Sequence, residues 1–129
     1  MRNTKGFTLV ELMIVMVIIG ILLSLLLPGL FSAREEALKT ETASNLRQVG
    51  IALYAHAKNN NGTLPATLNE LNTEGYIDDT SVLSSADGTP FTYSQASQDL
   101  YSLTSDAVLA YDDPDNIYLY ADGHVAVSN

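Results

Sequence analysis

The stretch KGFTLVELMIVMVIIGILLSLLLPGLF, residues 5–31, decides the fold of this 129-residue chain. From Phe7 to Phe31 it carries a single formal charge, Glu11. About 20 apolar residues at 1.5 Å per residue match a hydrocarbon core roughly 30 Å thick, so the stretch predicts a membrane-spanning helix. It is too long for the apolar region of a cleaved secretory signal, and it runs on into Arg34-Glu35-Glu36 without a small-residue cleavage site.

Charge is divided sharply along the chain. Arg2 and Lys5 precede the apolar stretch, so the positive-inside rule predicts a cytoplasmic N-terminus and an extracytoplasmic position for residues after about 30. All six basic residues lie within the first 58 positions, whereas residues 59–129 carry eleven acids and no base. A net charge of −9 argues against a nucleic-acid partner, and the absence of cysteine excludes a disulfide framework and a thiolate metal site.

Glu11 is a costly residue in this position. A carboxylate inside a membrane helix costs about 2.5–3.5 kcal/mol on insertion scales. Lys5 lies six residues earlier, and no base lies at helical spacing within the apolar stretch, so we expect the compensating charge to come from another molecule. The alternative is a carboxylate that snorkels to the lipid headgroups near the helix start.

Residues 5–12, followed by the apolar helix, closely resemble the N-terminal signature of type IV pilin-like proteins, the class III signal of type IV pilins and type II secretion pseudopilins. The resemblance covers about residues 2–30. It implies that a prepilin peptidase cuts between Gly6 and Phe7 on the cytoplasmic side of the membrane. Phe7 would then be the N-methylated first residue of the mature protein, and residues 1–6 a cleaved leader.

The same resemblance supplies a partner for Glu11. Cleavage creates an α-amino cation at Phe7, and the Glu11 carboxylate of one subunit can pair with the Phe7 ammonium of its neighbour. Only correctly staggered subunits make this pair, so it would set the axial register of a helical stack. The precursor lacks this amine and is expected to remain in the membrane as a monomer.

Two residues weaken the helix near the end of the apolar stretch. Pro28 lacks an amide hydrogen and Gly29 lowers helix propensity, so we expect a kink or a locally unwound segment there. Pro28 falls where many members of the family carry a helix-weakening proline. The resemblance therefore implies that Pro28 makes the helix flexible where it leaves the membrane.

The helix is expected to resume over Arg34–Lys58 and to end at Asn59-Asn60-Asn61-Gly62. A stripe of apolar residues at helical spacing predicts the face that packs on the globular domain: Leu46, Val49 and Leu53. If residues 7 to about 60 form one helix, its length is roughly 80 Å, too long for the remaining residues to bury. Its exposed apolar surface therefore predicts self-association.

Residues 62–129 predict a small antiparallel domain. Leu64–Leu71 is expected to form a short helix begun by Pro65, with Gly75-Tyr76-Ile77 as its exit. From Asp87 the apolar period changes to two, which predicts four or five short strands joined by hairpin-length turns: Pro90–Ala96, Leu100–Thr104, Val108–Asp112, Asn116–Ala121 and His124–Ser128. Asp122-Gly123 predicts a type I′ hairpin turn between the last two.

An acidic segment near the C-terminus is a candidate calcium site. Its hard oxygen donors are those that Ca²⁺ prefers: Asp112, Asp113, Asp115 and Asn116. Major pseudopilins are known for a calcium site in the loops of the C-terminal sheet, so the resemblance favours this interpretation. The spacing is not that of an EF-hand, and the alternative is an acidic, solvated hairpin turn.

The sequence offers no catalytic site. His56 lies near the apolar stripe of the helix and is expected to be a partly buried helix residue, and His124 is expected to be a surface residue after a turn. No Ser, His, Asp order has supporting context, and neither a Gly-rich phosphate loop nor paired carboxylates on a recognisable cleft can be identified. We therefore expect no enzymatic activity and, apart from calcium, no cofactor.

Together these features predict an α+β, pilin-like chain in four parts: a leader (1–6), a transmembrane and assembly helix (7–30), the extracytoplasmic half of the helix (31–61) and a sheet domain (62–129). The resemblance implies a filament subunit anchored in the bacterial inner membrane. Its expected partners are copies of itself, the prepilin peptidase and an inner-membrane assembly platform.

The absence of cysteine favours a type II secretion pseudopilin over type IV pilins whose C-terminal loop is closed by a disulfide. A type IV pilin of a surface filament remains the alternative. A third hypothesis, an anchored enzyme or ligand-binding module, would require a pocket with convergent polar groups and no dependence on Glu11.

Overall fold

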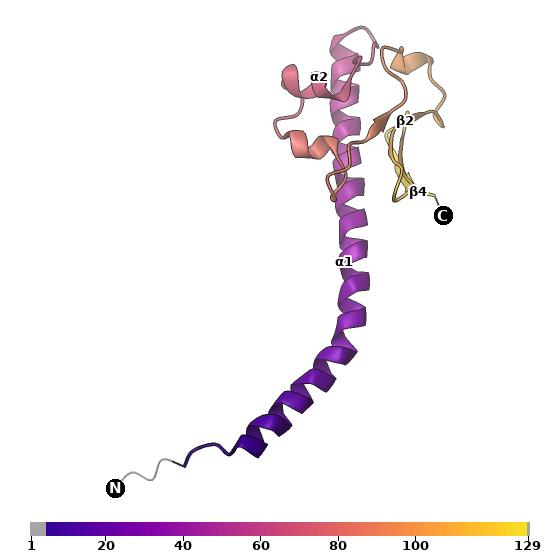
Figure 1. The fold of residues 1–129 in the computed structure, drawn as a ribbon. Coiled ribbons are helices and arrows are strands. Elements are labelled where there is room, and N and C mark those ends of the chain that lie inside the picture. Colours follow the sequence, from indigo (N-terminus) through magenta and orange to yellow (C-terminus); the bar gives the residue numbers. More distant parts are fainter. Residues whose placement is uncertain (1–4, 129) are drawn as a thin grey trace. The chain divides into compact units, whose positions relative to one another are not determined.

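Helix α1, Leu9–Asn59, is the largest element of the chain (Figure 1). The computed structural model describes residues 5–128. The chain divides into two compact units between Glu36 and Ala37, and α1 contributes to both. The second unit adds a short helix and a small antiparallel sheet, so the predicted α+β class is confirmed.

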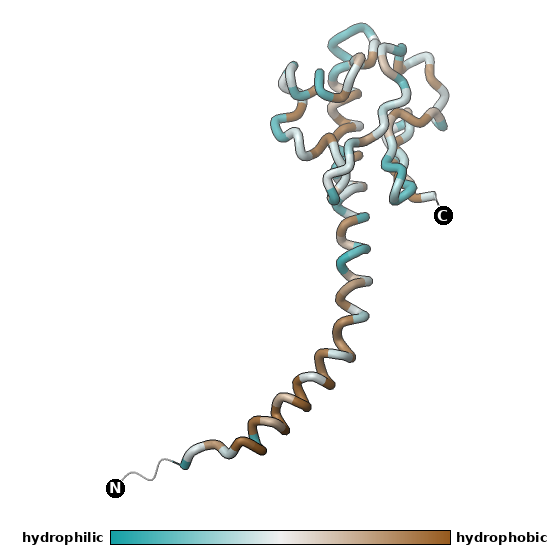
Figure 2. The backbone as a smooth tube through the Cα atoms, in the orientation of Figure 1, coloured by the Kyte–Doolittle hydropathy of each residue, from teal (hydrophilic) through white to brown (hydrophobic). Residues whose placement is uncertain are grey.

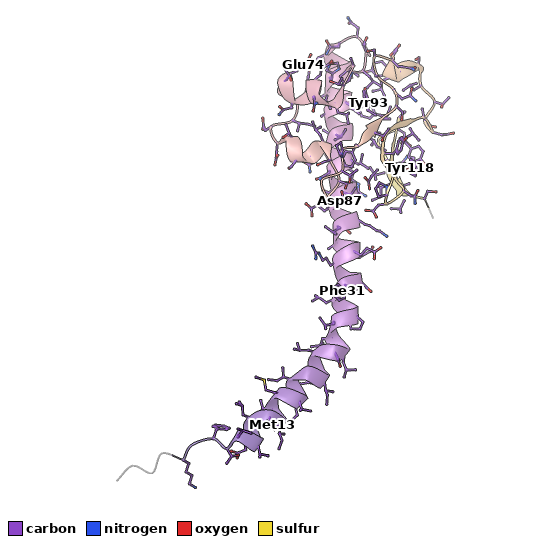
Figure 3. The ribbon with its side chains drawn as sticks, viewed as in Figure 1. Met13, Phe31, Glu74, Asp87, Tyr93 and Tyr118 are labelled. Carbon is purple, nitrogen blue, oxygen red and sulfur yellow. The ribbon has the colours of Figure 1, made fainter. Side chains whose placement is uncertain are left out.

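The first unit is almost entirely apolar helix (Figure 2). Met13 and Phe31 project from α1 without another element beside them (Figure 3), and both are more than half exposed. An 18-residue window of this helix is apolar enough to cross a membrane, and none of that window is buried within the described chain. The helical backbone satisfies its own hydrogen bonds, as a membrane-spanning segment must.

Pro28 lies inside α1, and the helix is continuous through Pro28 and Gly29. Of the two alternatives predicted here, a locally unwound segment is wrong, and a kink stays a prediction. Proline adopts a helical φ and removes only one donor from the ladder. Nearby hydroxyls bond to backbone carbonyls of the same helix: Ser24 Oγ donates to Ile21 O at 2.7 Å, and Ser32 Oγ donates to Pro28 O at 3.4 Å.

In the second unit, one face of α1 forms the centre of the core. The predicted stripe of Leu46, Val49 and Leu53 is confirmed, because all three side chains are fully buried. Gly50 lies beside the stripe, where an added Cβ would come within 3.0 Å of the Leu119 side chain. The helix and the sheet are therefore in close contact at this position.

Helix α2 spans Leu68–Thr73 and is followed by a 3-10 turn, η1, at Thr80–Leu83. The predicted start at Pro65 is wrong, because Thr67 is extended and serves as the N-cap of α2. Before it, the Pro65 carbonyl accepts from the Ser97 amide at 3.1 Å and from the Tyr93 hydroxyl at 3.0 Å, so it is bonded to distant segments rather than to the next turn of a helix. Gly75, with φ of +79°, ends the helix as predicted.

The sheet is antiparallel, with its strands in sequence order. The four strands are β1 Thr92–Tyr93, β2 Val108–Asp112, β3 Ile117–Tyr120 and β4 Val125–Val127. Figure 1 shows α2 on one flank of α1 and the sheet on the other. Hydrogen bonds join both flanks to the helix: Asn59 Nδ2 donates to the Tyr76 hydroxyl at 2.9 Å, and the Tyr54 hydroxyl donates to Ala121 O.

Two details of the predicted sheet are wrong. Leu100–Ser102 is a 3-10 turn, η2, because the Asp99 carboxylate accepts from Tyr101 N at 3.0 Å and the Leu100 amide is engaged by Gly62 O at 2.8 Å. The connection from β1 to β2 is therefore longer than a hairpin turn, since η2 lies within it.

The second detail is the turn between β3 and β4. Its hairpin is confirmed, with Leu119 opposite Val125. A type I′ turn needs positive φ at both central residues. Among the described residues of this turn only Gly123 has positive φ, at +89°, and its amide donates to Tyr120 O at 2.9 Å. This geometry fits a three-residue loop with a glycine bulge instead.

Candidate functional site

Residues 5–8 form an exposed segment without regular secondary structure, directly before α1. Lys5, Gly6, Phe7 and Thr8 belong to no helix or strand, and all four are exposed. The Phe7 side chain is 85% exposed, and nothing lies within 4 Å of a Cβ placed on Gly6. The Gly6–Phe7 peptide bond is therefore uncovered by the rest of the described chain. Residues 1–4 of the predicted leader, including Arg2, lie outside the described residues.

Thr8 and Glu11 cap the start of α1 reciprocally. Thr8 Oγ1 accepts from the Glu11 amide at 3.2 Å. Glu11 Oε2 accepts from the Thr8 amide at 2.9 Å and from the Thr8 hydroxyl at 3.1 Å. This is a capping box, which satisfies backbone amides that have no partner within the helix. The T-x-x-E spacing that encodes it was visible in the sequence and was missed.

The capping box leaves part of the Glu11 carboxylate unused. Both bonds from Thr8 go to Oε2, and among the described residues Oε1 has no hydrogen-bond donor. No described cation forms an ion pair with Glu11 either. Glu11 therefore has a local partner that stabilises the helix start and one oxygen that remains available to a donor from outside the chain.

The helix that follows exposes its apolar side chains all round. Within Leu12–Leu27, every leucine, isoleucine, valine and methionine is at least 45% exposed. Such a surface is unstable in water and stable against lipid or other apolar helices. The first unit therefore carries two features together, an uncovered peptide bond and a helix that needs an apolar environment.

The predicted calcium ligands lie in the turn between β2 and β3. Asp113 and Asn116 are exposed, Asp115 is half-buried, and Asp112 is 1% exposed. Among residues 5–128 no three histidine or acidic side chains converge in a way that would hold a metal ion. The calcium site stays a prediction, and Asp112 is the member of the set with the most unusual environment.

Asp112 points into the core of the second unit because it pairs with the buried Ile117 in the β2–β3 register. Neither carboxylate oxygen makes a hydrogen bond of regular geometry within the described residues, although the Asp115 backbone amide lies nearby. Burial raises the pKa of Asp112, and the neighbouring Asp115, Asp87 and Asp113 charges raise it further, while the Asp115 amide lowers it in part. A buried carboxylate of this kind is stabilised by a proton or by a cation.

His56 is buried, as predicted, and joins three segments. Its Nδ1 lies 3.1 Å from Thr63 O, and a carbonyl only accepts, so Nδ1 carries a hydrogen. Its Nε2 lies 3.3 Å from Glu74 Oε2, and its ring meets Tyr76 edge to face at 5.6 Å. These contacts hold the end of α1 against the segment after α2, so the structure gives His56 a packing role.

His124 is exposed, as predicted, and stacks on Tyr120 with ring centroids 4.3 Å apart. The Asp122 carboxylate accepts from the His124 amide at 3.0 Å, and this bond lowers the pKa of Asp122. Tyr118 and Tyr111 continue the same row of rings on the outer face of the sheet. These contacts stiffen the β3–β4 hairpin.

Comparison with known proteins gives the following matches. Residues 1–27 match the family model described as the prokaryotic N-terminal methylation motif. The chain is 52% identical over 46 residues to the type IV wide pilus major component PilA4 of Thermus thermophilus, which covers 36% of this chain and 35% of that protein. No solved structure matches the chain.

Two further relatives match beyond the N-terminal segment. The type II secretion system core protein G of Escherichia coli is 36% identical over 88 residues, 57% of this chain and 61% of that protein. The ComG operon protein 3 homolog of Bacillus licheniformis is 33% identical over 75 residues, 58% of this chain and 76% of that protein. The chain thus spans less than two thirds of the PilA4 and core protein G relatives.

Proposed function

Because this chain belongs to the type IV pilin-like family, we propose that it is a structural subunit of a helical filament, most specifically a pseudopilin of a type II secretion system. The single observation that carries the proposal is the exposed Gly6–Phe7 bond placed directly before an uncovered apolar helix. The chain itself would catalyse no reaction. Its role would be to assemble.

The first step is insertion and processing. The apolar helix would cross the bacterial inner membrane once with a cytoplasmic N-terminus, which places the Gly6–Phe7 bond within reach of a cytoplasmic-side prepilin peptidase. Cleavage there would remove residues 1–6 and leave Phe7 as an amine that is then methylated. The exposed backbone at residues 5–8, outside any helix or strand, supports this step, because a protease needs access to unfolded chain.

The second step is assembly through Glu11. Thr8 occupies Oε2 of the carboxylate, and Oε1 has no donor among the described residues. The Phe7 ammonium of a neighbouring subunit would supply that donor and the opposite charge. A carboxylate in hydrocarbon is costly when unpaired, so the pairing would favour one stagger of the helices over others. Assembly on an inner-membrane platform would then transfer the apolar helices from lipid to one another.

The pseudopilin is favoured over the type IV pilin by the extent of the matches. The similarity to core protein G of Escherichia coli covers 57% of this chain, which is more residues than α1 contains. The similarity to the pilus component covers 36% of this chain. The 52% identity to that pilus component keeps a surface filament for adhesion or motility as the second candidate.

Calcium is a further part of the proposal. The buried Asp112 carboxylate without a hydrogen-bond partner supports a bound cation, and the acidic neighbours Asp113 and Asp115 would strengthen its attraction. Calcium should raise the melting temperature of the full-length protein, and an Asp112→Asn variant should lose that response. If calcium raises the melting temperature of the variant equally, Asp112 is not a calcium ligand.

The experiment that tests the proposed function compares Glu11→Leu with Glu41→Leu in cells that hold the peptidase and the assembly platform. Glu41 is an exposed acid on the same helix, so it is a matched control. We expect Glu11→Leu to be processed normally and to lose assembly at least about tenfold, because its carboxylate can no longer pair with a neighbouring amine. Unchanged assembly of Glu11→Leu would contradict the proposal.

The cellular location of the assembled protein separates the two candidates. Assemblies that remain in the cell envelope, with no filaments in sheared surface material, support the pseudopilin. Long surface filaments of this chain in electron micrographs would support the type IV pilin instead.

A further inference from the structure

In the second unit, α1 keeps one face uncovered between its two flanking layers. Ser44, Arg47, Gln48 and Ile51 are exposed on this face, while the opposite face is buried in the core. Ile51 is 72% exposed, although the large apolar residues near it on α1 are buried. A large apolar side chain in this position loses stability in water unless another surface covers it.

Ile51 separates two grooves. The first, here called the basic groove, has a volume of about 380 Å³ and is lined by Arg47, Gly50, Tyr54, Gly123 and Ile51 itself. The second, here called the acidic groove, has a volume of about 350 Å³. Its lining includes Gln48, Asp78, Asp79 and Val82, with Ile51 at its edge.

The two grooves lie on opposite sides of the Ile51 ridge. With 3.6 residues per turn, positions 47, 50 and 54 fall on one side of Ile51 and positions 48 and 52 on the other. This agrees with the flanking elements, since Gly123 belongs to the β3–β4 turn and Val82 to η1. One side of the ridge therefore faces the sheet, and the other faces the α2–η1 segment.

The charges that line the grooves are opposite in sign. Arg47 is exposed and forms no ion pair with any described residue. The Asp78 side chain is exposed and makes no hydrogen bond or ion pair within the described chain, whereas the neighbouring Asp79 carboxylate caps η1 through Ser81 N at 2.9 Å. Each groove thus presents a charge that its own subunit leaves without a counter-ion.

We propose that these grooves bind each other across neighbouring copies of this chain, with Arg47 of one copy paired to Asp78 of the next and the two Ile51 ridges covered in the contact. This inference rests on the proposed filament and adds a contact outside the apolar segment. The complementary charges lie on one chain, which makes a second copy the fitting partner. Because the two grooves differ, one copy can offer its basic groove to one neighbour and its acidic groove to another, and this head-to-tail contact can repeat along a filament.

Charge reversal tests the pairing. Arg47→Glu and Asp78→Arg should each reduce assembly at least about tenfold, because each brings like charges together, and the double variant should recover most of the loss. Lys58→Glu and Asp106→Arg are matched reversals of exposed residues outside both grooves, and they should leave assembly within about twofold of the wild type. Single variants that assemble normally, or a double variant no better than the singles, would overturn the proposal.

Cross-linking tests the geometry directly, since the chain has no cysteine. Arg47→Cys and Asp78→Cys chains are co-expressed and treated with a short bis-maleimide, which spans more than the ~7 Å Cα separation that limits a disulfide. We expect a cross-linked pair that contains one chain of each kind, and little product from either variant alone. If both variants assemble but give no mixed product, or link instead to a different protein, the contact is wrong.

Failure of this contact can be told apart from failure of the proposed function. A wild-type chain that never assembles contradicts the filament itself. A wild-type chain that assembles through Glu11, but is indifferent to Arg47 and Asp78, leaves the filament intact and contradicts only the groove pairing.

Discussion

The two stretches of α1 contain the same types of apolar residue in opposite environments. In the first unit, Phe31 is 65% exposed, and the helix is hydrophobic along most of its length (Figure 2). In the second unit, Leu46 is fully buried and the apolar side chains are confined to one face. The first stretch must therefore find its apolar surroundings outside its own chain, in lipid or in neighbouring helices.

The contrast also separates two kinds of stability. Substitutions in the second unit should change the free energy of unfolding, whereas substitutions in the first should change membrane insertion and assembly. All seven tyrosines lie between Tyr54 and Tyr120, so intrinsic tyrosine fluorescence reports on the second unit alone. This signal therefore distinguishes changes in the stability of the second unit from changes in the first.

The largest effect is expected from a leucine in the core. Leu53→Ala should lower the free energy of unfolding of the second unit by about 2–5 kcal/mol, because Leu53 is fully buried and its removal leaves a cavity. Leu22→Ala, at a 55% exposed position of the first unit, should leave it unchanged. Urea titration in detergent, followed by tyrosine fluorescence, measures both. Equal losses would show that the first unit is part of the same folded core.

A lysine in the apolar stretch should affect the membrane instead. Ile18→Lys should cost about 2.5–3.5 kcal/mol of insertion free energy and move protein from the membrane fraction to the alkali-extractable fraction. Ser44→Lys, on the exposed face of α1 in the second unit, is the control and should remain membrane-bound. If Ile18→Lys stays fully in the membrane fraction, the helix does not span the bilayer.

Asp112 should make the second unit less stable as pH rises. Burial raises its pKa in the folded state above the unfolded value of about 3.9, so the folded chain binds the proton more tightly. Stability should therefore fall as pH increases from about 3.9 through the raised pKa. Asp112→Asn should flatten this dependence and add about 1–3 kcal/mol at pH 7 without calcium. Parallel pH profiles for both proteins would show that Asp112 is already compensated.

The smallest effect compares one cap in each unit. Asp79→Ala removes the carboxylate that accepts from Ser81 N and should lower the unfolding free energy of the second unit slightly but measurably. Thr8→Ala removes the cap of α1 and should leave that tyrosine-detected value unchanged. If Thr8→Ala lowers this free energy as much as Asp79→Ala does, the start of the helix contributes to the stability of the second unit, which contradicts the prediction.

Periodic features of the sequence predicted much of the fold. Strand β2 was predicted with its observed bounds, because an alternating run lies between turn signals. Leu100–Thr104 has similar residues but forms η2, since the Leu100 amide is taken by Gly62 O from a distant part of the chain. Distant bonds also prevented a helix at Pro65, because the Pro65 carbonyl accepts from the Ser97 amide and from the Tyr93 hydroxyl. Local pattern could not anticipate these contacts.

The candidate site shows the same limit. Gly6, Phe7 and Glu11 could be identified from the sequence because they form one short motif. The face of Asp112 could not be read from the alternation of β2, because a register shift between Val108 and Ala110 changes its phase.

Contacts between distant segments could not be predicted from the sequence either. The contact of His56 with Glu74, and the placement of Arg47 and Asp78 on either side of one ridge, depend on how distant segments pack.

The most direct test of the account is the intact mass of the assembled protein. Material is isolated by shearing or from the cell envelope, and a reversible cross-linker verifies that it is assembled. The cross-links are then reversed, and the chain is analysed by mass spectrometry. We expect a chain that begins at Phe7 and carries one added methyl group, with residues 1–6 absent. An assembled chain that still contains Met1–Gly6 would contradict processing at this bond and, with it, the pairing of Glu11 with a neighbouring amine.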